Sequence, residues 1–377
     1  METIKILHTA DIHIGAAESF LGESAESRKF ETLLTFEKIV DMAVSESVDI
    51  LAIAGDLFDS NNIEERLITA VFEKIKNCAT VKVVFSAGNH DPLSAESPFL
   101  RYDLPENLYV LGLSDECITF EDIKTRVYGR SFEHSRLQGE EKFTLEPEQD
   151  YINIMVQHGE LKSDLNSDYN AITPKFVKTS GMDYIALGHV HKRTEIGKID
   201  ATSFAYCGCP EGQGFDELDQ KGVFIGEVGK NLCDLKFVAI SKRQHIEAKI
   251  NISDLENATD IKNAVLNRLK ADYGESYKDN LYKILLVGEV SETAEINTAE
   301  ITSRLEEELY FVKVKNRTEF KLDYEQLSKE PSLKGIFVKK MLEKLSEVTT
   351  EEEKDILKKA LNLGLRAFNG EVKYDED

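Results

Sequence analysis

Five short polar segments, each placed directly after an apolar run, constrain this chain of 377 residues more than any other feature. The segments are HTADIH (8–13), GDLFD (55–59), GNHD (88–91), QHG (157–159) and GHVH (188–191). Six of the eight histidines of the chain fall inside them. A single histidine or Gly-Asp pair after a strand is more often structural or part of a turn. The combination of all five instead indicates one shared site.

The apolar runs before these segments have the length and β-branched composition of buried strands. They lie at 4–7, 50–53, 81–85, 152–156 and 184–187. Two intervening stretches have helical periodicity, with apolar faces at Phe36, Ile39, Val40 and Ala43 and at Leu67, Ala70, Val71 and Ile75. Alternating strands and helices predict an α/β fold with parallel strands, which bind ligands at the carboxyl ends of the strands. We therefore expect the five segments to converge.

The residue types in these segments favour a particular metal chemistry. Asp, His and Asn supply oxygen and nitrogen donors, which suit Mn²⁺, Fe²⁺ or Zn²⁺ better than a structural cysteine-bound zinc site. Two cations about 3.5–4 Å apart can clamp a phosphodiester, and a carboxylate between them offsets their mutual repulsion. Metal coordination also lowers the pKa of water and supplies hydroxide near neutral pH. The pattern therefore predicts a two-metal phosphoesterase.

The segments ADIH (10–13), GDLFD (55–59) and GNHD (88–91) resemble the calcineurin-like metallophosphoesterase family. Their order and wording are similar to the SbcD branch of DNA repair nucleases, and within it to the YhaO-type exonucleases. The resemblance covers roughly residues 1–240 well and the remainder only in layout. It implies a β-sandwich nuclease domain with flanking helices at 1–240, a small α/β capping domain at 241–325 and a C-terminal helical segment that binds a partner at 326–377.

The resemblance also implies a role for each candidate site residue. Asp11, His13 and His191 would bind the first metal, Asn89, His158 and His189 the second, and Asp56 both, while His90 would contact the scissile phosphate and protonate the leaving group. The chain has Asp59 where archaeal and eukaryotic relatives often carry a histidine, so a second catalytic histidine is not expected there. Asp59 and Asp91 are candidates for carboxylates that orient the histidine ligands. His134 and His245 match no motif.

Length and composition agree with an intracellular enzyme. The chain suits two or three domains, and it has neither a leader nor an apolar run that could span a membrane, so we expect a cytoplasmic protein. Its five cysteines are odd in number and mostly scattered, which fits a reducing compartment. Cys207 and Cys209 form a pair without a second pair to complete four ligands, so we interpret them as cysteines at a strand end.

The net charge of −23 is the opposite of that of a typical nucleic-acid binder. Two divalent metals would supply positive charge where the phosphate lies. Basic residues at 192–193, 242–243 and 313–317 could cluster, although such runs are more often solvated faces. We therefore expect weak DNA binding by the isolated chain, with a partner providing most of the affinity.

Beyond residue 240 the pattern predicts a second α/β unit. Strands are expected at 245–252, 282–290 and 310–314, and helices at 260–273 and 299–309. By the resemblance this unit helps to select DNA; the alternative is a purely structural appendage. A helical hairpin follows, with a capping box at Thr350 and Glu353 and an acidic tail at 371–377. Its apolar stripes are Phe337, Val338, Met341, Leu342 and Leu345 in one helix, and Ile356, Leu357, Ala360, Leu361, Leu365 and Phe368 in the other.

Such stripes usually pack on their own domain, but the resemblance implies that the hairpin clasps the coiled coil of an SbcC-like ATPase. Three functions follow. The first is a DNA exonuclease with two metal ions, Mn²⁺ before Fe²⁺ or Zn²⁺, that acts on double-stranded ends or single strands in DNA repair and recombination. The second is a phosphoesterase of small phosphodiesters or phosphoproteins. The third, a non-catalytic scaffold, is disfavoured because no ligand position is missing. Endonuclease activity, cleavage polarity and a homodimer stay open.

Overall fold

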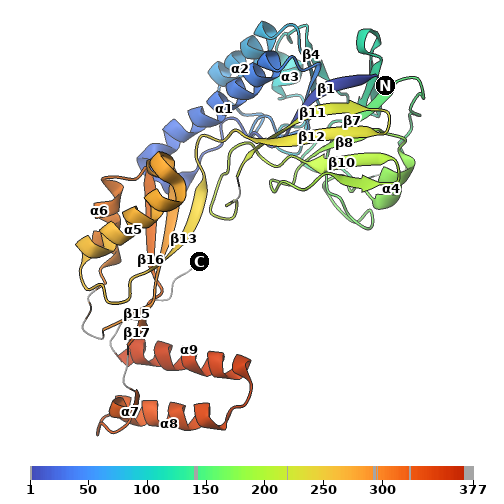
Figure 1. The fold of residues 1–377 in the computed structure, drawn as a ribbon. Helices are drawn as coiled ribbons and strands as arrows, with labels where there is room; N and C mark the ends of the chain where they lie inside the picture. Colours follow the sequence, from blue (N-terminus) through green and yellow to red (C-terminus); the bar gives the residue numbers. More distant parts are fainter. Residues whose placement is uncertain are drawn as a thin grey trace. The chain divides into compact units, whose positions relative to one another are not determined.

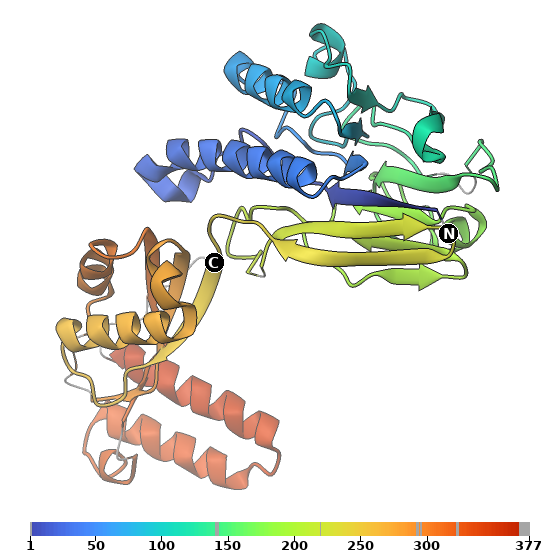
Figure 2. The ribbon, with the colours of Figure 1, turned by 45° about the horizontal axis from the view of Figure 1, so that its top comes forward.

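The computed structural model divides the chain into two compact units, Met1–His245 and Ile246–Asp377. It describes residues 2–368 apart from 140–142, 219, 292–293, 295 and 322–323. The expected acidic tail at 371–377 lies outside the described residues. Figures 1 and 2 show the two units, each of which is considered by itself below.

The first unit is built on two six-stranded sheets. One has the order β12-β11-β1-β2-β3-β4, with β1 (Thr3–Thr9), β2 (Ile50–Ile53), β3 (Lys82–Phe85), β4 (Leu108–Val110), β11 (Gly222–Gly229) and β12 (Leu232–Ala239). The other has the order β5-β6-β7-β8-β10-β9, with β5 (Glu116–Phe120), β6 (Thr125–Gly129), β7 (Ile152–His158), β8 (Tyr184–Gly188), β9 (Gly197–Ile199) and β10 (Thr202–Tyr206). The strands β1 to β4 pair in parallel, as do β6, β7, β8 and β10.

Alternate residues of the central strands face two different cores. In β2, Leu51 packs in the cluster with the helices, whereas Ile50 packs in a second cluster that joins both sheets. In that second cluster, Ile50 is accompanied by Ile154 of β7 and Tyr184 of β8. Burial on both faces explains why these strands are continuously apolar in the sequence. The expected β-sandwich is confirmed.

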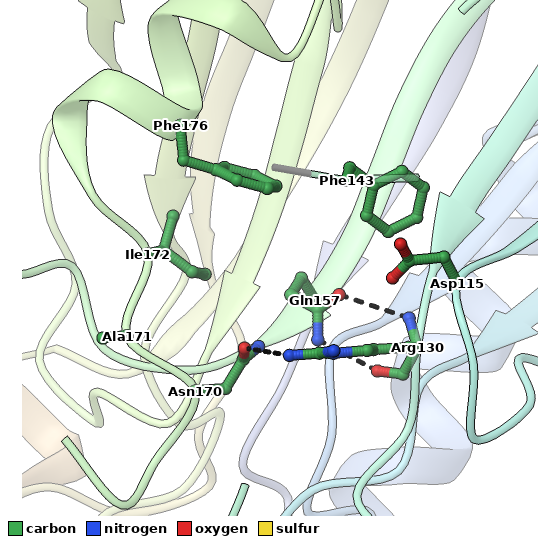
Figure 3. A pocket seen from close by; sticks show the side chains of 8 residues that line it. All are labelled: Asp115, Arg130, Phe143, Gln157, Asn170, Ala171, Ile172 and Phe176. Carbon is green, nitrogen blue, oxygen red and sulfur yellow. Dashed lines mark hydrogen bonds between the residues drawn. The ribbon is translucent and has the colours of Figure 1, made fainter. Parts of the chain in front are cut away.

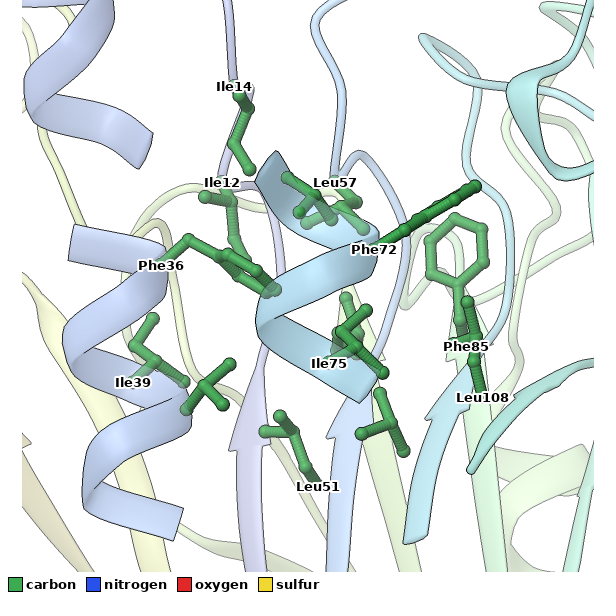
Figure 4. Packing of buried hydrophobic residues seen from close by; sticks show 14 of the residues in the cluster. Ile12, Ile14, Phe36, Ile39, Leu51, Leu57, Phe72, Ile75, Phe85 and Leu108 are labelled. Carbon is green, nitrogen blue, oxygen red and sulfur yellow. The ribbon is translucent and has the colours of Figure 1, made fainter. Parts of the chain in front are cut away.

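Helices cover the outer face of the first sheet. They are α1 (Ala25–Ser45) and α2 (Glu65–Asn77), and the unit also has η1 (Ser19–Ser24), α3 (Pro98–Arg101), η2 (Glu121–Ile123) and α4 (Pro174–Thr179). Figure 4 shows Phe36 and Ile39 of α1 and Ile75 of α2 directed into the cluster that contains Leu51. The apolar faces predicted at 3.6-residue spacing therefore pack on the sheet.

The second unit has a three-stranded sheet and two helices that match the predicted pattern. The sheet has the order β13-β14-β16, with β13 (His245–Asn251), β14 (Leu281–Val287) and β16 (Phe311–Asn316), and β15 (Glu289–Val290) pairs with β17 (Glu319–Phe320). The helices are α5 (Ala258–Tyr273) and α6 (Thr298–Glu306), with η3 (Gly274–Lys278) after α5. Asn257 and Asn297 cap α5 and α6 by accepting a backbone N–H from Asp260 and Glu300.

The chain ends in the expected helical hairpin, α8 (Leu333–Glu347) and α9 (Glu351–Phe368), preceded by the short helix α7 (Tyr324–Leu327) (Figure 1). The Thr350 hydroxyl accepts the backbone N–H of Glu353 at 3.4 Å and donates to its carboxylate at 2.7 Å, so the cap at the start of α9 is present. None of the helices in the described part of the chain is long and apolar enough to cross a membrane.

Most of the predicted stripe residues pack against one another inside the hairpin. Val338, Leu361 and Leu365 are buried together with Leu327 of α7. The exposed apolar side chains are Leu333, Ile336, Ile356, Leu363 and Phe368. Only Ile356 and Phe368 of these belong to the predicted stripes, because the turn-by-turn contact between α8 and α9 uses the rest. The apolar surface that the hairpin offers to solvent therefore differs from the stripes read in the sequence.

Candidate metal centre

The five polar segments meet at the ends of strands from both sheets. The segments after β1, β2 and β3 come from the first sheet, and those after β7 and β8 come from the second. Backbone hydrogen bonds tie neighbouring segments together: the N–H of Asp11 donates to the carbonyl of Gly55, and the N–H of His13 to that of Asp56, each at 3.0 Å. The N–H of Gly159 donates to the carbonyl of Gly188 at 3.2 Å. Convergence thus requires the sandwich and not one sheet alone.

Asp11, His13 and His191 form the first cluster of potential ligand atoms. The Nε2 atoms of His13 and His191 face each other at 3.1 Å. The Asp11 carboxylate accepts the backbone N–H of His189 at 2.9 Å. Asp11 and His13 are almost completely buried. The structure therefore brings together all three residues expected at the first metal.

Asn89, His158 and His189 form the second cluster. Asn89 Oδ1 lies 3.0 Å from His158 Nε2 and 3.1 Å from His189 Nδ1. Asp56 lies between the two clusters, with its Oδ2 atom 3.4 Å from His158 Nε2 and 3.8 Å from His13 Nε2. This is the place that a bridging carboxylate would occupy.

The orientation of the imidazoles fits a pair of cations. His158 Nδ1 lies 2.9 Å from the carbonyl of Ala54, which can only accept, so Nδ1 carries the proton and the Nε2 lone pair points at Asn89 and Asp56. His191 Nδ1 likewise donates to Glu217 Oε1 at 2.5 Å, which leaves Nε2 toward His13. Two facing Nε2 atoms have no acceptor between them, and a cation would satisfy both. The donors of the two clusters are nitrogen and oxygen atoms, as Mn²⁺, Fe²⁺ and Zn²⁺ accept.

Backbone strain is concentrated at the predicted ligands. Asp11, His13, Asp56 and His189 have positive φ angles of 51°, 50°, 50° and 98°. Residues other than glycine rarely adopt this conformation, and it persists where the surrounding structure over-determines it. Gly88 is needed for a different reason, since a Cβ atom there would collide with the Asp56 side chain.

The two acidic residues expected to orient histidines act in different ways. Asp59 Oδ1 lies 3.2 Å from His13 Nδ1, and the Asp59 carbonyl accepts from His90 Nδ1 at 3.0 Å. Asp91 instead binds backbone: its buried carboxylate accepts the N–H groups of Gly88 and Leu57 at 2.9 and 2.7 Å, and those of Asp56 and Phe58 at longer distances. Burial, followed by the charge of Asp56, raises the pKa of Asp91 to about 7.

His90 stands apart from the other predicted residues because its side chain is 45% exposed. Its backbone N–H donates to Asp56 Oδ1 at 2.9 Å, and its ring packs edge-on against that of His13 with centroids 4.6 Å apart. His90 therefore lies next to both clusters with a face open to a substrate.

Burial and charge act against each other at the clusters. Burial raises the pKa of Asp56, but the charges of His158, His13 and His90 outweigh this effect and lower it. Burial lowers the pKa of His13, but Asp59 and the charges of Asp56 and Asp11 leave it raised. Burial lowers the pKa of His189.

Two residues near the clusters were not predicted. Tyr169 stacks on His189, with ring centroids 4.7 Å apart and planes at 26°. Glu217 binds His191 and accepts from Cys209 Sγ at 3.3 Å. Neither has a local signal: Tyr169 lies in a polar loop, and Glu217 is one of 69 acidic residues. Cys209 and Cys207 follow the end of β10, as expected, and both are buried.

A small pocket lies behind β7 and does not coincide with the clusters (Figure 3). Its polar wall contains Arg130, Gln157 and Asn170, and the Arg130 guanidinium donates to Asn170 Oδ1 at 3.2 Å. Asn170 Nδ2 in turn donates to the carbonyl of His158 at 2.8 Å. The pocket wall therefore supports the backbone at the second cluster.

The other singled-out charged residues lie elsewhere. The basic pair Lys242 and Arg243 contacts the Glu31 carboxylate at 2.8 Å through both side chains, so this pair is part of an ion-pair network and not a solvated face. His245 is buried beside Glu18, with 3.3 Å between Nε2 and Oε2, and His134 is exposed.

Comparisons with known proteins agree with this geometry. Residues 4–193 match the calcineurin-like phosphoesterase family. The chain is 27% identical over 270 residues to the uncharacterized metallophosphoesterase YhaO of Bacillus subtilis, covering 68% of this chain and 65% of that one. It is 29% identical over 263 residues to the DNA double-strand break repair protein Mre11 of Methanopyrus kandleri, covering 63% and 57%. A shorter match, 33% over 105 residues, links it to a component of the SbcCD nuclease of Rhodobacter capsulatus, covering 26% and 25%. The first two matches span less than two thirds of those relatives' lengths.

Proposed function

From the premise that this chain belongs to the calcineurin-like phosphoesterase family, we propose that it hydrolyses phosphodiester bonds of DNA with two divalent cations. One observation carries the proposal: two clusters of nitrogen and oxygen donors share a single buried carboxylate, that of Asp56. When bound, such cations neutralise phosphate charge and lower the pKa of a nucleophilic water.

In this proposal the protein residues divide into holders and a proton donor. Asp11, His13 and His191 hold the first cation, Asn89, His158 and His189 hold the second, and Asp56 contacts both. His90 contacts the scissile phosphate and gives a proton to the leaving oxygen, because its exposed ring lies beside the clusters. We propose Mn²⁺ before Fe²⁺ or Zn²⁺ as the working metal.

Two observations support DNA as the substrate. Relatives named for double-strand break repair and for the SbcCD nuclease share the sequence of the first unit. A separate unit with its own sheet and core follows, which a small-molecule esterase does not need. We propose that residues 241–325 help to select duplex ends or single strands, that the enzyme acts as an exonuclease in DNA repair, and that it works in the cytoplasm.

The acidic composition points to a partner that supplies affinity for DNA. At a net charge of −23 the chain repels phosphate outside the metal centre. We propose that residues 326–377 bind the coiled coil of an SbcC-like ATPase through the exposed apolar side chains of α8 and α9, among them Leu333, Ile336 and Leu363. The same net charge favours the second candidate function, a phosphoesterase of small phosphodiesters that needs no DNA affinity.

One experiment separates the two candidates. The purified chain is incubated with Mn²⁺ and, in turn, with linear duplex, single-stranded DNA and a nitrophenyl phosphodiester. We expect cleavage of all three, with slow duplex degradation that the cognate ATPase accelerates. Cleavage of the nitrophenyl ester alone, even with the ATPase present, would favour the small-molecule function. Absence of hydrolysis of any substrate with Mn²⁺, Fe²⁺ or Zn²⁺ would contradict the enzyme itself.

A further inference from the structure

Glu217 occupies the outer side of the first cluster and has no role in the proposed function so far. Its side chain is 13% exposed. Oε1 accepts from His191 Nδ1 at 2.5 Å, and Oε2 accepts from the backbone N–H of Gln213 at 3.0 Å and from Cys209 Sγ at 3.3 Å. Three donors therefore converge on one carboxylate, and one of them belongs to a predicted ligand.

The backbone of His191 is fixed from the same side. Lys221 Nζ donates to the carbonyl of His191 at 3.1 Å and lies 3.8 Å from Glu217 Oε2. Both Lys221 and Cys209 are buried. The imidazole and the main chain of His191 are thus held by neighbouring groups that also contact each other.

The loop that carries Glu217 is itself tied to buried charges. Glu211 Oε1 accepts from the Thr35 hydroxyl at 2.7 Å, and Glu211 Oε2 pairs with the Arg28 guanidinium at 2.9 Å. Arg28 also donates to the carbonyl of Gly212 at 2.9 Å. Breaking such a buried pair costs several kcal/mol in other proteins, so it resists displacement of the loop. Glu217 therefore approaches His191 from a fixed base on α1.

We infer that Glu217 is a positioning residue, which sets the orientation and the Nδ1-protonated tautomer of His191 so that Nε2 faces the first cation. The inference rests on the proposed metal site and deepens it. An imidazole whose distal nitrogen donates to a carboxylate is oriented and is a more basic ligand, and loss of such a partner typically weakens metal binding 10- to 100-fold. Glutamine cannot replace Glu217 without loss, because an amide offers one acceptor oxygen and here both oxygens accept.

The test uses the full chain and Mn²⁺ alone. Isothermal titration of the metal-free protein gives the stoichiometry and Kd of each Mn²⁺, and electron paramagnetic resonance reports whether two Mn²⁺ ions are coupled. We expect Glu217→Gln and Glu217→Asp to weaken one of the two sites by about 10- to 100-fold and to reduce the coupled signal. The melting temperature of the metal-free protein should stay unchanged, since the donors to Glu217 lie at the edge of the fold.

Glu195→Gln is the matched control. It removes one negative charge four positions from His191 in the sequence, from a side chain that is 96% exposed. This variant should bind Mn²⁺ as the unaltered chain does. Unchanged affinity in both Glu217 variants, an equal loss in the control, or a lowered melting temperature of the metal-free variants would overturn the inference. Failure of the unaltered chain to bind two Mn²⁺ ions would instead overturn the proposed function.

Discussion

Histidines of the same polar segments do different work, and their environment decides which. His8 and His13 belong to one segment, yet His8 faces the interior of the sandwich. Its Nε2 donates to the carbonyl of Leu187 at 3.2 Å, so Nδ1 accepts the Tyr184 hydroxyl at 2.8 Å. Burial lowers the pKa of His8 to about 3. His8 is therefore a neutral core residue that links β1 to β8.

The burial of His8 predicts an acid-dependent loss of stability. Below pH 6.5 the unfolded chain binds a proton at His8 that the folded chain refuses down to about pH 3. This group therefore contributes full stability above pH 6.5, and its contribution falls by about 1.4 kcal/mol per pH unit as the pH drops through that window. Urea unfolding of His8→Gln should show a shallower pH dependence. The same substitution at exposed His134 should leave the slope unchanged, and equal slopes in all three proteins would contradict the assignment.

Asp56 is predicted to hold both cations. Asp56→Asn keeps the size of the side chain but removes the charge that offsets their repulsion, so metal content and hydrolysis should fall together. Elemental analysis after dialysis against Mn²⁺, paired with nitrophenyl phosphodiester turnover, measures both. Two retained metals with normal turnover would remove Asp56 from the bridging position.

His90 should serve the substrate and not the metal. His90→Ala is expected to keep its Mn²⁺ stoichiometry while the cleavage rate falls by about 10²–10⁴-fold, the usual contribution of a positioned proton donor. Reduced metal content would show that His90 is a ligand instead. A smaller defect on a nitrophenyl ester than on DNA is expected, because nitrophenolate needs no proton to leave.

At the scale of elements, the turns after the strands decide where ligands point. The carboxylate of Asp91 gathers the N–H groups of the turns after β2 and β3, and Gly88 lets Asp56 approach. Any side chain at Gly88 would displace the proposed bridge. The turns therefore act as rigid parts of the site and not as flexible connections.

Gly88→Ala tests this rigidity. The added Cβ would overlap the Asp56 carboxylate and lie 2.8 Å from its backbone nitrogen. A displacement of about 1 Å at a catalytic group can cost about 10²-fold in rate, so kcat and Mn²⁺ affinity should both fall. Gly214→Ala, whose Cβ would meet only the end of the exposed Asp216 side chain, is the control. Equal activity of the two variants would show that the turn adapts.

At the scale of the molecule, the two units have separate cores and separate proposed tasks. The clusters of polar ligand atoms lie wholly in Met1–His245, whereas the hairpin has its own cluster around Leu327, Val338 and Leu361. Leu327 of α7 belongs to that cluster, so the hairpin and α7 form one packing unit. A cut at Leu333 would divide it.

Truncation after Lys321 removes α7, α8 and α9 together. The truncated chain should fold and hydrolyse a nitrophenyl phosphodiester with Mn²⁺ at the rate of the full chain, because no site residue is lost. Association with the cognate ATPase and ATP-stimulated duplex degradation should disappear. A truncated protein that is insoluble would show that the hairpin completes the core, and one that still binds the ATPase would place the partner surface elsewhere.

The sequence by itself determined the strands, the helices and the residues that gather at the site. Apolar periodicity is local, so β1, β2, β3, β7 and β8 and the buried faces of α1 and α2 could be predicted from neighbouring residues. Each candidate ligand follows one of those strands closely, and the structure brings all seven together with His90 beside them.

Only the tertiary structure decided how the five segments meet and what supports them. The strand–helix pattern indicated a parallel sheet, but three segments come from one sheet and two from the other, because the pairing of strands depends on residues far apart in the chain. Glu217 reaches His191 across 26 positions, and Asp91 reaches the turn of Asp56 across 35. The same holds for the hairpin, where packing of α8 on α9 buried most of the stripe residues and left Leu333 and Ile336 in solvent. Periodicity specifies that a face is apolar, whereas its partner is specified only by the fold.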